Sequence, residues 1–366
     1  MHALTRSGLR QPEVFPVFYG PTPTDSIRNA SNTYSLINSV EFHPRENLFC
    51  AAFTTVNKLI LMKVTQQGKL KTVQVIGNPT AALAEPQHAV FSQDGNKIIA
   101  VNWDNATFTI YERLPDGLYA SKPVAVIPFP PELKDYKPHG IEISPSGEFL
   151  AVAFGVTTRH KKGLALFKYH HAESRLQLLN LIEEAQLPGI PKGIAFSPDE
   201  SCLLVTFSNI NSISVYDLDW AAGAIKVAPR QVFQGALTGL SRPEDIKISA
   251  EGDHLIVSNS GANTVTCYHF DKSSNSIGEE TPYYILDNPN ARIRFPHGIS
   301  LSADGSVLAI TQFGPLEEKD DGNIVFGHRT PRRQAKINIY RREHTRPVFS
   351  TGWKSTLSSL LHRLTR

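Results

Sequence analysis

A motif that recurs six times along the chain restricts the folds open to it. Its clearest copy spans residues 296–305 and reads PHGISLSADG. Equivalent copies begin at residues 37, 86, 138, 191 and 243, so that successive copies lie 49 to 53 residues apart. A nearly constant period of this size is typical of repeats that stack along a line or around a centre, and it argues against independent domains.

Each repeat contains short β-rich runs separated by turn residues. In the fourth copy the runs are Ile194–Ser197, Leu203–Phe207 and Ile213–Tyr216, with a Pro-Asp turn after the first. A weaker fourth run precedes the next copy. In successive repeats this run spans residues 73–76, 124–127, 178–182, 228–233 and 283–286. The sequence therefore predicts an all-β fold, a β-propeller of four-stranded antiparallel blades.

The predicted propeller spans residues 37–342. Its repeats are 37–85, 86–137, 138–190, 191–242, 243–295 and 296–342. Six blades are expected. A seventh, degenerate blade is the alternative, because the two tails outside the repeats together have about the length of one repeat.

The two tails are expected to close the ring. The N-terminal segment, residues 1–36, should contribute a closing strand, and its β-rich run Glu13–Tyr19 would lie beside Ile337–Tyr340. The alternative closing strand, Pro347–Phe349, belongs to the C-terminal segment 343–366. That segment should end in a short basic amphipathic helix over residues 353–366, docked on a blade edge.

Composition places the chain among ordinary globular proteins. Of its 366 residues, 41% are hydrophobic and 19% are charged. Its three cysteines lie within β-rich runs without the spacing of a metal site, so reduced core cysteines are expected. No run approaches the about 20 apolar residues of a membrane span. The N-terminus lacks the apolar stretch of a signal peptide, so a cytoplasmic location is expected.

Aligning the repeats brings the residues that follow each proline to one mouth of the central channel. The second position of each copy holds Asn38, Gln87, His139, Lys192, Glu244 and His297, and in the first copy Ile37 stands in place of the proline. The next position adds His88 and Asp245. A blade needs no ionisable residue here, whereas imidazoles beside carboxylates in a partly dry channel suit acid–base chemistry. The residues expected to act in catalysis are His139, Lys192, Glu244 and His297.

A structural explanation stands beside the catalytic one. Channels of propellers are often lined by polar residues because water fills them, and each histidine would then only hydrogen-bond the backbone of the neighbouring blade. No cofactor is expected, and no metal ligands are assigned, because the histidines and Glu244 belong to separate blades. A divalent metal ion at this ring is the alternative.

Charged loops at the same mouth point to an anionic ligand. The net charge is only +3, yet basic residues occur in the loops that enter the ring and in two inserted hairpins, 156–163 and 315–334. Such a mouth would attract a carboxylate or phosphate compound. The residues expected to bind this ligand are Asn38, Gln87, His88, Asp245, Arg159, Arg242 and Arg294.

Other partners follow from the same loops. The long 315–334 insertion is a candidate contact for a protein partner, since long irregular loops in compact domains are usually functional or disordered. Nucleic acid is not expected, because the basic loops lack interleaved aromatics. Membrane contact by residues 353–366 is not expected either.

The repeat resembles that of a known family. Its best copies, residues 191–217 and 243–270, carry the Pro, the Ser-Pro-Asp or Ser-Ala-Glu turn and a later Asn-x-hydrophobic run. This pattern resembles the lactonase-type β-propellers, which include 6-phosphogluconolactonase, and the related YVTN-repeat proteins. The resemblance implies opening or closing of small anionic lactones by His, Glu and Arg residues in the central channel.

The chain departs from that family at two points. The family has Gly-Pro-Arg-His at the start of one inner strand and Asn-Glu-Leu after the next, whereas this chain has Ile190-Pro191-Lys192-Gly193 and Ser208-Asn209-Ile210. Its members also usually have seven blades. His139, His297 and Glu244 would have to supply an equivalent set from other blades.

Two functional hypotheses follow. The first is a lactonase-like propeller that binds and hydrolyses a small anionic metabolite, a sugar acid, lactone or phosphorylated compound, at the basic channel mouth. The second is a non-catalytic scaffold that holds a protein through its long loops. No Gly-x-Ser-x-Gly motif, phosphate-binding glycine loop or CxxC pair is present, so most other enzyme classes are excluded.

Overall fold

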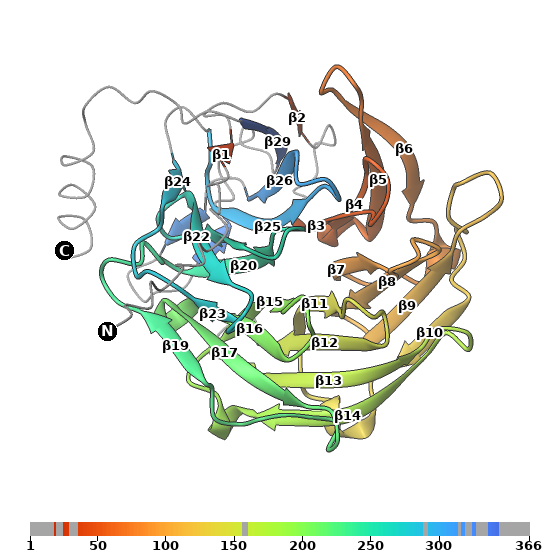
Figure 1. Cartoon of the computed structure of the whole chain (residues 1–366). Coiled ribbons are helices and arrows are strands. Elements are labelled where there is room, and N and C mark those ends of the chain that lie inside the picture. Colours follow the sequence, from red (N-terminus) through yellow and green to blue (C-terminus); the bar gives the residue numbers. More distant parts are fainter. Residues whose placement is uncertain are drawn as a thin grey trace, which may run out of the picture.

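The computed structural model describes residues 18–19, 25–28, 36–155, 160–287, 292–313, 316–318, 324–326 and 336–343. Within them, six antiparallel sheets are arranged around a central channel, as Figure 1 shows. The predicted all-β propeller is confirmed, with six blades rather than seven. Among the described residues no helix has the length and apolar character needed to cross a lipid bilayer.

The first three blades each contain four consecutive strands. Blade one contains β3 (Ile37–Phe42), β4 (Leu48–Phe53), β5 (Lys58–Val64) and β6 (Leu70–Ile76). Blade two contains β7 (Pro86–Phe91), β8 (Lys97–Asn102), β9 (Thr107–Glu112) and β10 (Ala125–Pro128). Blade three contains β11 (Pro138–Ile143), β12 (Phe149–Phe154), β13 (Gly163–His170) and β14 (Arg175–Glu183).

The fourth and fifth blades each have a fifth, short strand, which pairs with the last residues of the third strand. Blade four contains β15 (Pro191–Phe196), β16 (Cys202–Phe207), β17 (Ser212–Asp219), β18 (Ala224–Ile225) and β19 (Gln231–Gln234). Blade five contains β20 (Pro243–Ile248), β21 (His254–Asn259), β22 (Thr264–Asp271), β23 (Ser276–Ile277) and β24 (Tyr284–Leu286). Five short 3-10 turns lie in the described loops, at Thr54–Val56, Pro79–Ala81, Pro131–Leu133, Glu184–Gln186 and Ser208–Ile210.

The sixth blade combines strands from both ends of the chain. From the channel outward, its first three strands are β25 (Pro296–Leu301), β26 (Val307–Gln312) and β29 (Lys336–Glu343). On the outer side, β2 (Asp25–Arg28) pairs with Lys336–Ile339, and β1 (Phe18–Tyr19) pairs with the end of β29. In the described part of the chain, Asp25–Arg28 thus occupies the place beside Ile337 that was expected for the run Glu13–Tyr19. Of that run the structure describes Phe18 and Tyr19, which pair with Glu343 and Arg342.

Other expectations about the tails lie outside the described residues. These are the alternative closing strand Pro347–Phe349 and the helix over residues 353–366. Of the 315–334 insertion, the structure describes a small hairpin of β27 (Leu316–Glu318) and β28 (Ile324–Phe326).

The core lies between the blades. One cluster joins blades two and three through buried side chains such as Phe108 and Phe167, and comparable clusters join the other neighbouring blades. Cys50, Cys202 and Cys267 are buried free thiols, as predicted. Burial of apolar side chains on both faces of each sheet thus holds the blades side by side.

The asparagine of the repeat connects neighbouring blades. Asn211 lies just before β17 in the left-handed region, with φ 52°, and its Oδ1 accepts a hydrogen bond of 2.7 Å from the backbone N–H of Arg242. Asn57 and Asn263 form equivalent bonds with Glu85 and Phe295, of 2.7 and 2.6 Å. In blades one, four and five the acceptor side chain thus ties the blade to the residue before the next inner strand, which helps to position the channel mouth.

Glycines let the inner strands approach closely around the channel. A Cβ on Gly298 of β25 would lie 2.8 Å from both the backbone oxygen of Asn38 and the Cα of Ser39 in β3. A Cβ on Gly193 of β15 would lie 2.6 Å from the Cα of Asp245. Because no side chain fits here, the neighbouring backbones pack tightly and bring the preceding residues of the ring together.

Candidate active site in the central channel

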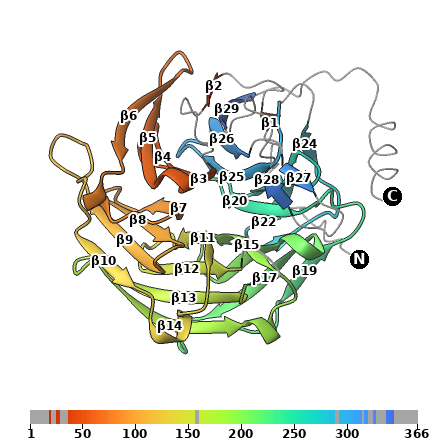
Figure 2. The same ribbon diagram turned by 180° about the vertical axis from the view of Figure 1, so that it is seen from behind.

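The inner strands of all six blades surround a small pocket at one mouth of the channel. Strands β3, β7, β11, β15, β20 and β25 lie innermost in Figure 1, and Figure 2 shows the same ring from behind. The space between the atoms of the pocket amounts to about 210 Å³, a value that includes open solvent. It is lined by Asn38, His88, His139, Gly140, Lys192, Gly193, Glu244, Asp245, His297 and Gly298. The alignment of the repeats thus predicted which strand positions face the channel.

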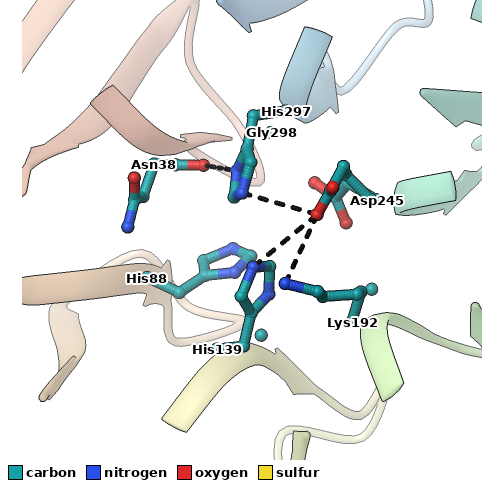
Figure 3. A pocket seen from close by; sticks show the side chains of 10 residues that line it. Asn38, His88, His139, Lys192, Asp245, His297 and Gly298 are labelled. Carbon is teal, nitrogen blue, oxygen red and sulfur yellow. Dashed lines mark hydrogen bonds and ion pairs between the residues drawn. The ribbon is translucent and has the colours of Figure 1, made fainter. Parts of the chain in front are cut away.

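Three nitrogen atoms surround one oxygen of Glu244. Its Oε2 lies 3.8 Å from His139 Nε2, 3.6 Å from Lys192 Nζ and 3.6 Å from His297 Nε2. Figure 3 shows the side chains of His139, Lys192 and His297, which come from three different blades, with dashed lines that meet at one oxygen. The separations exceed hydrogen-bond distance, and Oε2, although buried, makes no hydrogen bond. The other oxygen, Oε1, accepts a hydrogen bond of 3.0 Å from Ser260 Oγ.

Backbone hydrogen bonds orient both histidines. His297 Nδ1 lies 2.7 Å from the backbone oxygen of Asn38, and a carbonyl oxygen can only accept, so Nδ1 donates. His297 Nε2 therefore faces Glu244. His139 hydrogen-bonds the backbone of Lys192 in the next blade. The structural explanation, in which each histidine hydrogen-bonds the backbone of the neighbouring blade, thus also holds. The same hydrogen bonds direct the second ring nitrogen of each histidine toward Glu244.

Burial sets the charge states in the pocket. Desolvation, reinforced by the nearby Lys192, holds the pKa of His139 well below its ordinary value. Desolvation also lowers the pKa of His297, although Glu244 opposes the shift, and it lowers the pKa of Lys192. Both imidazoles are therefore neutral at pH 7, and a neutral imidazole can accept a proton.

Aromatic rings flank the histidine of blade six. The ring of Phe313 stacks on His297 with centroids 4.4 Å apart, and Phe295 stacks on Phe313 at 5.7 Å. Phe313 follows the second strand of its blade, the same position as Ser260 in blade five. Sequence reasoning missed these two residues, although aligning the ends of the second strands would have identified this position.

A second ionisable cluster lies deeper in the channel. Lys247 Nζ lies 2.8 Å from Glu41 Oε2 and also pairs with Glu142, so it joins blades one, three and five. Burial raises the pKa of Glu142 to about 8. For Glu41 the effect of burial is outweighed by Lys247 and His88, and its pKa is lowered. These residues occupy the fifth position of the inner strands, which the sequence analysis did not compare.

The structure brings together most of the predicted site residues. His139, Lys192, Glu244 and His297 converge, and Asn38, His88 and Asp245 line the same pocket. Gln87 accepts a hydrogen bond from Asn38 but does not line the pocket.

The predicted arginines are not found among the described residues that line the pocket. Arg242 and Arg294 are not among the lining residues, and Arg294 is exposed. Arg159 lies outside the described residues. The lining therefore carries one lysine against the two acidic residues Glu244 and Asp245, and it supplies no excess of positive charge by itself.

Three comparisons place the chain among known proteins. Residues 29–236 match the family described as "Lactonase, 7-bladed beta-propeller". No curated protein sequence matches the chain. The matched segment contains the strands of blades one to four. The family's description gives seven blades, whereas the described part of this chain forms six.

Solved structures show the same fold at low sequence identity. The periplasmic gluconolactonase PpgL from Pseudomonas aeruginosa is 18% identical, with 69% of each chain covered and a TM-score of 0.50. A putative 6-phosphogluconolactonase from Bacteroides fragilis is 15% identical, covering 79% of this chain and 82% of that one, with a TM-score of 0.53. Regucalcin, a calcium-binding protein from Agrobacterium tumefaciens, is 15% identical, with coverage of 88% and 97% and a TM-score of 0.57. Since the family match covers more than half of its length, the chain belongs to the lactonase β-propeller family.

Proposed function

We propose that this protein is a lactone hydrolase whose active site is the pocket around Glu244. The observation that carries the proposal is the convergence of His139, Lys192 and His297 on a buried carboxylate oxygen without a hydrogen bond, in a propeller of the lactonase family. Buried polar groups are usually satisfied, and exceptions cluster where substrate or solvent takes part in chemistry.

Hydrolysis of a lactone requires a base for water and a positive group for the oxyanion. In the proposed reaction, a water molecule between Glu244 and the two histidines loses a proton to one of these three side chains and attacks the acyl carbon of the lactone. Lys192 stabilises the negative charge that develops on the carbonyl oxygen. The bond from the acyl carbon to the ring oxygen then breaks, and the proton passes to the departing alkoxide to give the hydroxy acid.

We also propose that the substrate is small and anionic. The pocket is narrow, so a substrate that reaches Glu244 must be small. Lys192 is the lining residue that attracts an anion, Arg242 lies directly before β20, and Arg294 lies two residues before β25. A carboxylate or phosphate on the lactone would be held by these cations. The scaffold hypothesis is less favoured, because a flat docking face has no use for a buried ionisable cluster.

The test is turnover and binding with a panel of lactones. Purified protein is assayed for hydrolysis of sugar lactones with and without a phosphate or carboxylate group. Ligand-induced rises in melting temperature are measured for the same compounds. The wild type should hydrolyse at least one lactone and be stabilised by the corresponding acid. Both effects should vanish in the variant His139→Ala/Glu244→Ala/His297→Ala. A folded wild type that neither hydrolyses nor binds any of these compounds would refute the proposal.

A further inference from the structure

Two candidate ligand atoms face each other inside the pocket. His297 Nδ1 donates a hydrogen bond to the Asn38 carbonyl, so Nε2 is the ring nitrogen that faces Glu244 Oε2, 3.6 Å away. This oxygen makes no hydrogen bond and is buried. A buried carboxylate oxygen and a ring nitrogen at this distance can hold a proton or a cation between them.

The third member of the cluster points to a metal cation rather than a proton. His139 Nε2 lies 3.8 Å from the same oxygen, and the ligand atoms of His139, Glu244 and His297 all lie within 4.8 Å of one another. In a tetrahedral zinc site with bonds of 2.0 to 2.2 Å, donor atoms are about 3.4 Å apart. The two distances to Glu244 exceed this value by a few tenths of an ångström, and the limit of 4.8 Å on the third distance means that the two histidine rings must rotate toward each other to complete the geometry.

The surroundings of the three ligands are those of a metal site. The second ring nitrogen of a metal-bound histidine usually donates to a carbonyl or carboxylate. His297 Nδ1 does so to Asn38, and His139 is held by the backbone of Lys192. Ser260 Oγ donates a hydrogen bond to Oε1 of Glu244, which leaves Oε2 as the ligand atom.

The ligand set also indicates which metal. Two imidazoles and one carboxylate, with the pocket open on one side, suit zinc or a related late transition metal in a catalytic site. Calcium needs six to eight oxygen ligands and would be a poor match for two nitrogens.

We propose that His139, Glu244 and His297 bind a single zinc-type divalent cation at the channel mouth. This inference rests on the proposed function in one respect: the cation would polarise the water that attacks the lactone. Lys192 Nζ lies 3.6 Å from the same Glu244 oxygen and is therefore a competing cation in the metal-free protein. Removing this competitor should tighten metal binding even though it removes a polar group from the pocket.

The experiment is a metal titration independent of turnover. Protein treated with a chelator is titrated with Zn²⁺ by calorimetry and with Co²⁺ by visible absorption, which reports tetrahedral coordination. The wild type should bind one equivalent. Glu244→Gln and His297→Gln should weaken binding at least about 100-fold. Lys192→Met should strengthen it by about tenfold or more. His88→Gln, a histidine variant in the same pocket but outside the ligand set, should keep the wild-type affinity.

The outcomes separate this inference from the proposed function. If wild type and Lys192→Met are folded and neither binds one equivalent of either ion, the metal site is wrong. Equal binding by wild type and Glu244→Gln would also refute it, since the bound ion would then lie elsewhere. Lactone hydrolysis by the metal-free protein would leave the proposed function standing without the metal. Tight metal binding without hydrolysis of any lactone would leave the metal site standing and refute the proposed function.

Discussion

At the scale of single residues, burial of ionisable groups dominates the channel. Lys247 holds Glu41 and Glu142 together across three blades, and Asp245 accepts 2.9 Å hydrogen bonds from the backbone N–H groups of Ile246 and Ile299. Burial raises the pKa of Asp245 as well as that of Glu142. Glu142 therefore retains near neutral pH a proton that the unfolded chain releases.

The raised pKa of Glu142 has a measurable consequence. Between its ordinary value of 4.5 and about 8, the folded state keeps this proton while the unfolded state loses it. The contribution of Glu142 to stability is therefore complete below pH 4.5 and declines as pH rises to about 8. Glu142→Gln lacks this dependence, so its stability relative to wild type should rise with pH. Urea unfolding at several pH values between 5 and 9 measures it; a constant difference would contradict the assignment.

The candidate site was partly predictable at this scale. The second residue of each repeat lines the channel pocket in every blade except blade two, where it is Gln87, so alignment alone identified Glu244 and its three neighbours. It did not identify Lys247 and its partners, because in sequence they look like the polar positions of alternating strands. The protonation states also depend on burial, which the sequence pattern does not report.

At the scale of strands, close packing of the inner backbones determines the size of the pocket. Gly298→Ala would place a Cβ 2.8 Å from the backbone of β3, which cannot move without shifting its blade. The expected loss of stability is about 1–3 kcal/mol. Gly278→Ala is the matched control, because its nearest neighbour would be 3.8 Å away. The control should stay within about 1 kcal/mol of wild type. Equal melting temperatures for both variants would contradict the packing account.

The asparagine between β16 and β17 offers a second test at this scale. Asn211→Ala loses the bond to the Arg242 N–H and must keep φ near 52°, which alanine disfavours. A loss of about 2 kcal/mol is expected. Asn211→Gly loses the bond but tolerates the conformation, so it should be affected less. Chemical denaturation ranks the three proteins, and a glycine variant less stable than the alanine variant would count against this explanation.

Strand positions were predictable where apolar residues alternate, and less so elsewhere. The fourth strands of blades one to five lie within a few residues of the predicted runs. In contrast, β2 has the sequence DSIR, which carries no β pattern. It is a strand because it pairs with the edge of β29, a tertiary effect that local sequence does not reveal.

At the scale of the whole molecule, a repeat period was enough to predict the propeller but not its activity. Six copies of one motif gave six blades, and pairing of β2 with β29 joins both ends of the chain in one sheet. The chemistry lies in residues that break the symmetry of the repeat, since one position holds asparagine, glutamine, histidine, lysine, glutamate and histidine in turn. Their roles became arguable only from their distances around Glu244.

The most direct measurement compares lactone hydrolysis by wild type, Glu244→Gln and Glu142→Gln under identical conditions, after subtraction of the spontaneous rate. Both variants replace a buried channel carboxylate, but only Glu244 lies within 4 Å of His139, Lys192 and His297. The account predicts that Glu244→Gln loses about 100-fold or more in kcat, while Glu142→Gln stays within about threefold of wild type. Equal rates for wild type and a folded Glu244→Gln variant would contradict it.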